Sequence, residues 1–139
     1  MTDSNLWKRS EEKISVKANF FPVPILIALQ QQVMQEIVKK GVIVETLPTS
    51  NVRISQYTHI QEHYVFRWMH LPGVKVDGDP DIQVCLGSDD PGIFATDLHN
   101  EFYHLYAVLV NEFDTTDKEA INMLGKVNER GRHYRFHPR

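Results

Sequence analysis

The sequence predicts an α/β fold in which helices alternate with short buried strands. Segments with apolar residues at helical spacing alternate with short apolar runs bounded by turn-forming residues. Their order along the chain is helix, strand, helix, strand, helix, which is typical of a parallel sheet. The chain has 139 residues, of which 42% are hydrophobic and 24% are charged, so it can form one globular domain with its own core.

Residues 1–23 are expected to form an N-terminal segment outside this alternation. Residues 1–13 are mostly polar, and apolar residues then alternate with polar ones from Ile14 to Phe20. A period of two is typical of a strand with one face in water. We therefore predict a loose start followed by a candidate edge strand.

The first helix is predicted over residues 24–40 and the first strand over residues 42–47. Pro24 suits the first turn of a helix, and Gly41 suits the position just after its end. The apolar face of this helix is expected to consist of Leu26, Leu29, Val33, Ile37 and Val38. The run after Gly41 is almost wholly apolar and stops at Pro48, which predicts a strand buried on both faces.

A second helix and a second strand are predicted further along the chain. Residues 59–69 have apolar residues at helical spacing, and residues 71–73 (Leu-Pro-Gly) follow as a terminator. Residues 77–80 (Asp-Gly-Asp-Pro) predict a turn. Residues 82–86 predict a short apolar strand.

Two helices are predicted in the C-terminal part. One covers residues 98–113 with Asp97 as its N-cap. Its inward face is expected to consist of Leu98, Phe102, Leu105, Leu109 and Phe113. The other covers residues 116–130, opens with a capping box between its first residue and Glu119, and is expected to stop before Gly131.

Charge and cysteine content exclude several classes of partner. With 15 Lys and Arg against 18 Asp and Glu, the net charge of −3 creates no field that attracts nucleic acid or anionic membranes. The basic tail at residues 132–139 is interpreted as a solvated terminus. The single cysteine, Cys85, can form no intramolecular disulfide and is expected to pack within its strand. Without a leader pattern or a long apolar stretch, a cytoplasmic protein with no membrane span is expected.

Ligand-binding residues are expected at the carboxyl ends of the two strands, where loops vary while the scaffold holds them. These loops are residues 47–51 and 87–92, both polar and sharply turned. Asp89 and Asp90 are adjacent carboxylates after a buried strand, and a metal ion would compensate their repulsion. The alternative is that Asp89 caps the following loop, residues 90–92 form an ordinary turn, and both carboxylates point to water.

Two strings of residues resemble a known family. Residues 44–51 (VETLPTSN) and 87–94 (GSDDPGIF) are similar to the ends of strands seven and eight in the adenosine and AMP deaminase family. These ends read much like E-x-C-P-S/T-S-N and S-D-D-P-x-x-F in that family. The combination is more specific than either string alone, and the resemblance covers roughly residues 24–113.

The resemblance implies zinc-dependent hydrolytic deamination of a purine amino group on a (β/α)8 barrel. Residues 24–131 would then form a partial (β/α)8 barrel, consisting of its last two strand–helix units with an extra C-terminal helix. Asp89 resembles the catalytic aspartate that also binds Zn²⁺, and Asp90 resembles the aspartate that binds the purine. Ser50 and Asn51 match the motif that shapes the floor of the substrate pocket. Zinc suits this chemistry because it lowers the pKa of bound water to about 7.

The sequence departs from the family in its metal ligands. The family's zinc site also needs a His-x-His pair and another histidine from earlier strands, and its catalysis needs a glutamate and a further histidine. No two of the seven histidines here form a His-x-His pair. The resemblance therefore implies the C-terminal part of a deaminase, inactive alone. Its parent would act on a purine nucleoside or nucleotide. Its partner would be the missing N-terminal barrel portion or a second copy, so we expect an oligomer. The alternative is a noncatalytic, deaminase-like assembly module that self-associates or binds a partner chain.

Three other groups of residues allow both a functional and a structural interpretation. His59 and His63 are four apart and could ligate one metal ion, but surface histidines are expected. Residues 77–81 begin like a calcium loop, yet they lack its closing glutamate and are expected to form a solvated turn. The aromatic residues within 64–68 could stack on nucleic-acid bases, but core and rim positions are expected.

Overall fold

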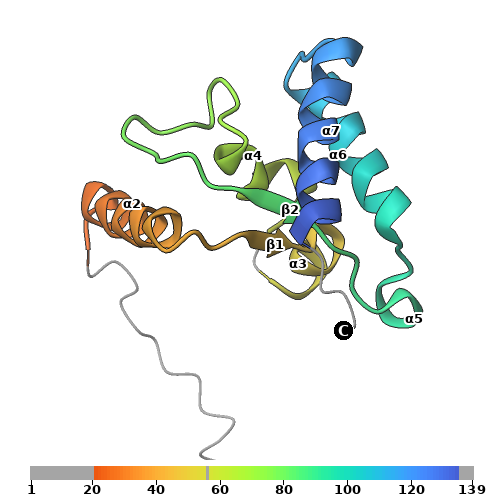
Figure 1. Ribbon diagram of the computed structural model, residues 1–139, viewed down its shortest axis with the longest axis horizontal. Helices are drawn as coiled ribbons and strands as arrows, with labels where there is room; N and C mark the ends of the chain where they lie inside the picture. The colour runs from red at the N-terminus through yellow and green to blue at the C-terminus, as the bar shows by residue number, and fades with distance from the viewer. Residues whose placement is uncertain (1–20, 56, 135–139) are drawn as a thin grey trace, which may run out of the picture.

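The computed structural model describes residues 21–55 and 57–134. The candidate edge strand at residues 14–20 and the tail residues 135–139 lie outside this part. In chain order the elements are α2 (Val23–Lys39), β1 (Val44–Thr46), α3 (Pro48–Ile54), the 3₁₀ helix η1 (Ile60–Glu62), α4 (Val65–Trp68), β2 (Val84–Leu86), α5 (Pro91–Phe94), α6 (Leu98–Glu112) and α7 (Asp117–Tyr134) (Figure 1). The predicted alternation of helices and strands is therefore present, with additional short helices.

The two strands form a parallel sheet, as predicted. Val44 pairs with Val84, and Thr46 pairs with Leu86. Each strand has three residues, fewer than the apolar run that predicts it. The described part of the chain is thus a mixed α/β structure with a two-stranded sheet.

The prediction that the first strand is buried on both faces is wrong. In β1, Val44 is half-buried, Glu45 is exposed and Thr46 is buried. Among the described elements β1 packs mainly against β2, so the face of β1 that carries Glu45 remains open to water. β2 is better covered, because α7 packs on it and buries Val84 and Leu86.

The core lies between β2, α4, α6 and α7. Its buried apolar residues include Val65, Phe66, Val84, Leu86, Leu105, Leu109, Leu124 and Val127. The burial of Leu105 and Leu109 confirms part of the predicted inward face of α6. Leu98 contradicts it, because this first residue of the helix lies at the rim of a groove between α6 and α7 and is 42% exposed.

Helix α7 begins with the predicted capping box and runs further than predicted. The Thr116 backbone N–H donates to the Glu119 carboxylate at 3.2 Å, and the Glu119 N–H donates to the Thr116 hydroxyl at 3.4 Å. The predicted stop before Gly131 is wrong, because the helix continues to Tyr134. A Cβ atom added at Gly131 would lie 3.7 Å from the Cβ atom of Cys85, so the last turns of α7 pass close to β2 and are held in helical form by that packing.

Two other segments differ from their predicted local structure. Residues 59–69 form η1 and α4 instead of one helix, and His63 between them is extended (φ −67°, ψ 138°). The His63 ring accepts the Val65 N–H at 3.1 Å, which replaces the backbone bond of a continuous helix. The loop expected after the first strand forms α3, whose first position is Pro48, a residue that needs no hydrogen-bond acceptor there.

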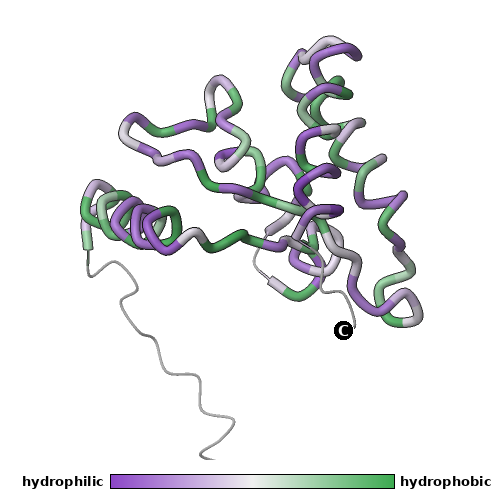
Figure 2. Tube along the Cα trace, viewed as in Figure 1, coloured by the Kyte–Doolittle hydropathy of each residue, from purple (hydrophilic) through white to green (hydrophobic). Residues whose placement is uncertain are grey.

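Helix α2 has nearly the predicted bounds but not the predicted burial. Gly41 follows it in the left-handed conformation (φ +64°), as expected of a residue just past a helix end. Of the α2 residues only Met34 is buried. Of the predicted apolar face, Ile37 is half-buried, and the other positions are exposed: 44% at Leu26, 53% at Leu29, 59% at Val33 and 42% at Val38. Figures 1 and 2 show α2 lying apart from α6 and α7, with hydrophobic residues distributed along it. Within the described residues, this apolar face has no partner.

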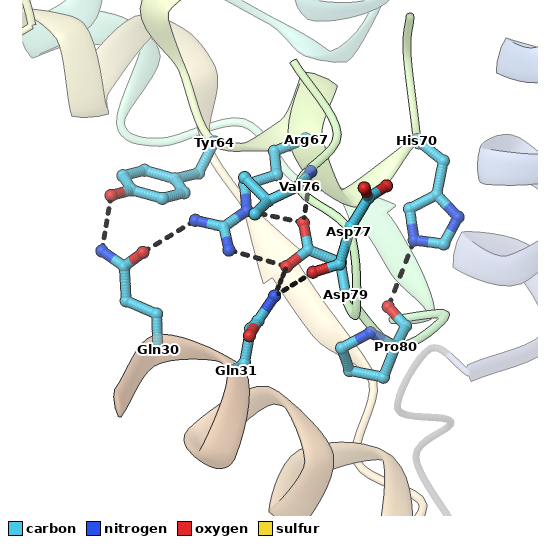
Figure 3. A network of polar contacts seen from close by, with 9 residues as sticks. All are labelled: Gln30, Gln31, Tyr64, Arg67, His70, Val76, Asp77, Asp79 and Pro80. Carbon is cyan, nitrogen blue, oxygen red and sulfur yellow. Dashed lines mark hydrogen bonds and ion pairs between the residues drawn. The ribbon is translucent and has the colours of Figure 1, made fainter. Parts of the chain in front are cut away.

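A buried ion pair joins α2 to the rest of the molecule (Figure 3). Arg67 of α4 forms two hydrogen bonds of 2.7 Å with the Asp79 carboxylate, and both side chains are buried. Gln30 and Gln31 of α2 contact Arg67 and Asp79 respectively. The prediction of a solvated turn at residues 77–81 is therefore wrong for Asp79, because the Arg67 guanidinium compensates the cost of burying its charge.

The aromatic residues near Arg67 have the predicted structural positions. Phe66 is buried, Trp68 is half-buried and Tyr64 is exposed, which confirms core and rim roles. Among the described helices, none is long and apolar enough to cross a membrane.

Candidate functional site

The carboxyl ends of β1 and β2 lie side by side. The Gly87 N–H donates to the Thr46 carbonyl oxygen at 3.0 Å, which continues the pairing of the strands past their ends. The segments that follow also meet, because the Arg53 guanidinium of α3 donates to the carbonyl oxygen of Phe94 in α5. The structure therefore brings the two segments that carry the predicted site residues to one edge of the sheet.

Asp89 and Asp90 form the turn between β2 and α5. Asp90 is the N-cap of α5, and its Oδ1 accepts the N–H groups of Gly92 and Ile93 at 2.7 and 3.1 Å. Asp89 is half-buried, and its Oδ1 accepts the Asp90 N–H at 2.8 Å. For Oδ2 of either carboxylate, the described residues offer no hydrogen-bond donor. Capping of α5 uses one oxygen of Asp90 and leaves the other available to a ligand.

Ser50 and Asn51 differ in what they can offer a ligand. Ser50 is 1% exposed, and its hydroxyl donates to the Leu47 carbonyl oxygen at 3.2 Å, so its role in this structure is to hold the first turn of α3. Asn51 is half-buried, and its Oδ1 lies 3.0 Å from Nε2 of His63 and 3.3 Å from the hydroxyl of Thr46. Of the two, Asn51 is the one with a side chain that reaches the surface.

A buried glutamate that the sequence analysis missed links the two segments. Glu101 of α6 is 1% exposed. Its carboxylate accepts the Thr49 N–H at 3.0 Å and the Thr96 hydroxyl at 2.8 Å. The signal in the sequence is a carboxylate within the apolar stripe of α6, four residues before the buried Leu105. Such a residue is buried only when its oxygens find donors.

His63 is the second residue whose role the sequence analysis missed. The expectation of a surface histidine holds for His59, which is exposed, and is wrong for His63, which is 3% exposed. Burial lowers the pKa of His63 to about 4, an effect partly offset by the negative charge of Glu101. The ring is therefore neutral at pH 7 and acts in a hydrogen-bond network with Asn51 and Thr46.

The described residues do not by themselves fit a zinc site. Catalytic zinc has three protein ligands and an open position. In the described part of the chain, no group of three or more His, Cys, Asp and Glu residues could hold a metal ion. Asp89, the predicted metal-binding residue, could supply a single carboxylate and no more.

An apolar groove of about 530 Å³ between α6 and α7 is separate from this edge. Its lining includes Phe102, Tyr103, Tyr106 and Ile121, and none of the four predicted site residues. The predicted site residues therefore lie outside this groove.

Comparisons with known proteins point to one class of enzyme. The chain is 30% identical over 90 residues to the adenine deaminase of Agrobacterium fabrum. It is 29% identical over 85 residues to the adenosine deaminase of Plasmodium vivax, and 28% identical over 99 residues to that of Plasmodium falciparum. The chain is similar to adenosine and adenine deaminases.

The similarity to deaminases covers part of this chain and a smaller part of each relative. It covers 65% of this chain and 24% of the Agrobacterium enzyme, and 61% of this chain and 21% of the Plasmodium vivax enzyme. The chain thus spans about a quarter or less of the length of these curated relatives. No protein-family model matches the chain.

Proposed function

We propose that this chain is the C-terminal strand–helix part of a zinc-dependent adenosine or adenine-nucleotide deaminase, and that it is inactive alone. The reaction is the hydrolytic removal of a purine amino group. The observation that carries the proposal is the parallel pairing of the two strands that end in the deaminase-like strings. This pairing puts residues 47–51 and 87–92 at the edge where parallel α/β folds bind their ligands.

In the proposed enzyme, Asp89 provides one zinc ligand and Asp90 a contact to the purine. Each has a carboxylate oxygen without a donor among the described residues, which supports a role toward a ligand. One carboxylate cannot hold a catalytic zinc ion, so the remaining ligands come from another segment of polypeptide.

The proposed partner is the missing N-terminal barrel portion or a second copy of the chain. Within the described residues, each strand pairs on one side, and the apolar face of α2 is exposed. A barrel removes open strand edges and covers the apolar faces of its helices. Both features support a partner that continues the sheet beside β1.

Complementation in trans tests the proposal. The purified chain is mixed with the N-terminal portion of the Agrobacterium adenine deaminase, cut before its matching segment. Zinc content, mass in solution and loss of the adenine or adenosine absorbance band are then measured. We expect zinc binding and turnover in the mixture and neither in this chain alone. Turnover by the chain alone would contradict the proposed inactivity.

Asp89→Ala is the variant that tests the assigned ligand. We expect it to abolish both zinc binding and turnover in the mixture, because it removes the carboxylate assigned to the metal. Asp81→Ala, which removes an exposed carboxylate outside the strand-end edge, is the matched control and should leave both unchanged. Full activity of the Asp89→Ala mixture would overturn the assignment.

A noncatalytic assembly module is the second candidate, and the exposed apolar face of α2 favours it. In that case Asp89→Ala and Asp90→Ala leave oligomer size and partner binding unchanged. A charge at the half-buried position 44 of β1 (Val44→Asp) disrupts them, whereas Val84→Asp would place a charge in the core and destabilise the fold itself. Sedimentation of these variants, each checked for its fold by circular dichroism, separates the two candidates.

A further inference from the structure

The His63 ring has one fixed donor and one fixed acceptor. Its Nδ1 accepts the Val65 N–H at 3.1 Å. A neutral imidazole carries its proton on one nitrogen, so a ring that accepts at Nδ1 donates from Nε2. The buried position of the ring, between β1, α3 and α4, keeps it neutral at pH 7.

This donor fixes the orientation of the Asn51 side chain. Nε2 of His63 lies 3.0 Å from Oδ1 of Asn51, and the Thr46 hydroxyl donates to the same oxygen at 3.3 Å. The two donors occupy both lone pairs of the amide oxygen. A rotated amide would place its NH₂ group against the Nε2–H, leaving two donors face to face.

The amide nitrogen of Asn51 consequently points away from the network. The described residues contain no acceptor for Nδ2 of Asn51. No buried side-chain nitrogen or oxygen in the described part lacks a partner. Nδ2 therefore reaches the surface at the strand-end edge, where it can only donate hydrogen bonds.

We propose that Asn51 is a specificity-determining residue that offers a ligand donors alone, and that His63 is the positioning residue that fixes this polarity. The group bound by Asn51 is a hydrogen-bond acceptor of a purine compound. It is a ring nitrogen of the base, an oxygen of the sugar or an oxygen of a phosphate. This inference rests on the proposed function for the identity of the ligand, but the polarity of Asn51 follows from the network alone.

Nuclear magnetic resonance of the ¹⁵N-labelled chain tests the network without any enzymatic activity. We expect a neutral His63 protonated at Nε2 at pH 7, and an Asn51 side-chain NH₂ that exchanges readily with water. A ring protonated at Nδ1, or an Asn51 NH₂ group protected from water, would overturn the inference.

Two substitutions of His63 test the positioning role. Gln retains a donor and an acceptor, whereas Leu retains neither. We expect His63→Leu to change the Asn51 side-chain signals and His63→Gln to restore them, with backbone spectra showing that both variants fold. If a variant fails to fold, the wild-type tautomer and water-exchange measurements still decide the question. Equal changes in two folded variants would contradict positioning by hydrogen bonds.

Titration with adenine, adenosine and AMP at millimolar concentration identifies the acceptor. A shift of the Asn51 NH₂ signals with adenine places the acceptor on the base. A shift that first occurs with adenosine places it on the sugar, and one that first occurs with AMP places it on the phosphate. We expect Asn51→Asp to weaken binding at least about tenfold, since it replaces donors by acceptors. Asn111→Asp, an exposed position on α6, is the matched control.

The outcomes separate this inference from the proposed function. No shift of Asn51 with any of the three compounds overturns its ligand-facing role, whatever the complementation shows. A shift of Asn51 in a chain that fails to complement a deaminase supports this inference and contradicts the proposed function.

Discussion

The polar residues buried near the strand ends hold segments that are distant in sequence. Glu101 of α6 binds the start of α3 through Thr49 and the end of the α5 turn through Thr96. His63 binds Asn51 of α3 in the same way. A buried polar group contributes little net stability while paired, but its loss leaves its partners unsatisfied. These side chains therefore fix the geometry of the candidate site.

Glu101→Ala tests this at the scale of one residue. We expect the free energy of unfolding to fall by about 2 to 3 kcal/mol, because the buried Thr49 N–H and the Thr96 hydroxyl lose their acceptor. Urea denaturation followed by circular dichroism measures it. Glu112→Ala, at an exposed position at the end of the same helix, should change stability by less than about 0.5 kcal/mol. Equal effects of the two substitutions would contradict the role of Glu101.

The pH dependence of stability should report His63. Its pKa is about 4 in the folded chain against an ordinary value of 6.5. As pH falls, this histidine is therefore protonated in the unfolded chain before it is protonated in the folded chain. The free energy of unfolding should fall by up to about 3 kcal/mol between pH 6.5 and pH 4. Below this window, protonation of Asp79, whose pKa Arg67 holds well below its usual range, adds a further loss.

Two variants isolate the contribution of His63 to the pH dependence of stability. His63→Gln carries no titratable ring, so the slope of stability against pH between 6.5 and 4 should become shallower. His59→Gln removes an exposed histidine and should keep the slope of the wild type. Chemical denaturation at several pH values measures both, and an unchanged slope in His63→Gln would show that this ring is not the group that titrates.

At the level of secondary-structure elements, Gly87 just after β2 and Gly131 in α7 should respond to substitution by Ala in opposite ways. A Cβ atom at Gly87 would clash with the Glu45 carboxylate and lie 2.7 Å from Cδ2 of Leu47, so Gly87→Ala displaces these two side chains. We expect a cost of about 1 kcal/mol, because the exposed Glu45 side chain can turn into water and only Leu47 must repack. At Gly131 the added atom meets only an ordinary contact of 3.7 Å, and helix propensity favours Ala by up to about 1 kcal/mol. Thermal unfolding of both variants compares them, and destabilisation by Gly131→Ala would contradict the packing of α7 described above.

For the molecule as a whole, a substitution on the exposed face of α2 should affect association with a partner without affecting the stability of the isolated chain. Leu29 is 53% exposed, so Leu29→Lys should change the free energy of unfolding of the isolated chain by less than about 0.5 kcal/mol. If a partner covers this face, Leu29→Lys should weaken complex formation at least about tenfold, because the lysine charge would be buried in the interface. Sedimentation of the mixture measures association, and Lys39→Ala, at an exposed α2 position outside the apolar stripe, is the control. Unweakened association of Leu29→Lys would place the interface elsewhere.

Local sequence is sufficient to predict the features that depend on neighbouring residues. The helix starts at Asp97 and Thr116 are confirmed, because capping uses side chains within one turn. The order of helices and strands along the chain predicted the parallel sheet, and two short strings of residues carried the similarity to deaminases. The roles of Asp89, Asp90, Ser50 and Asn51 toward a ligand stay predictions.

Contacts between distant parts of the chain determine which polar residues are buried and which segments they connect. Asp79, His63 and Glu101 look like surface residues in the sequence, and each is buried because a partner from another element satisfies it. The apolar stripe of α2 shows the reverse, since its pattern predicts burial and the described residues provide nothing to cover it. The physical reason is the same in both cases, because burial depends on which distant groups meet, and a local pattern carries no information about that meeting.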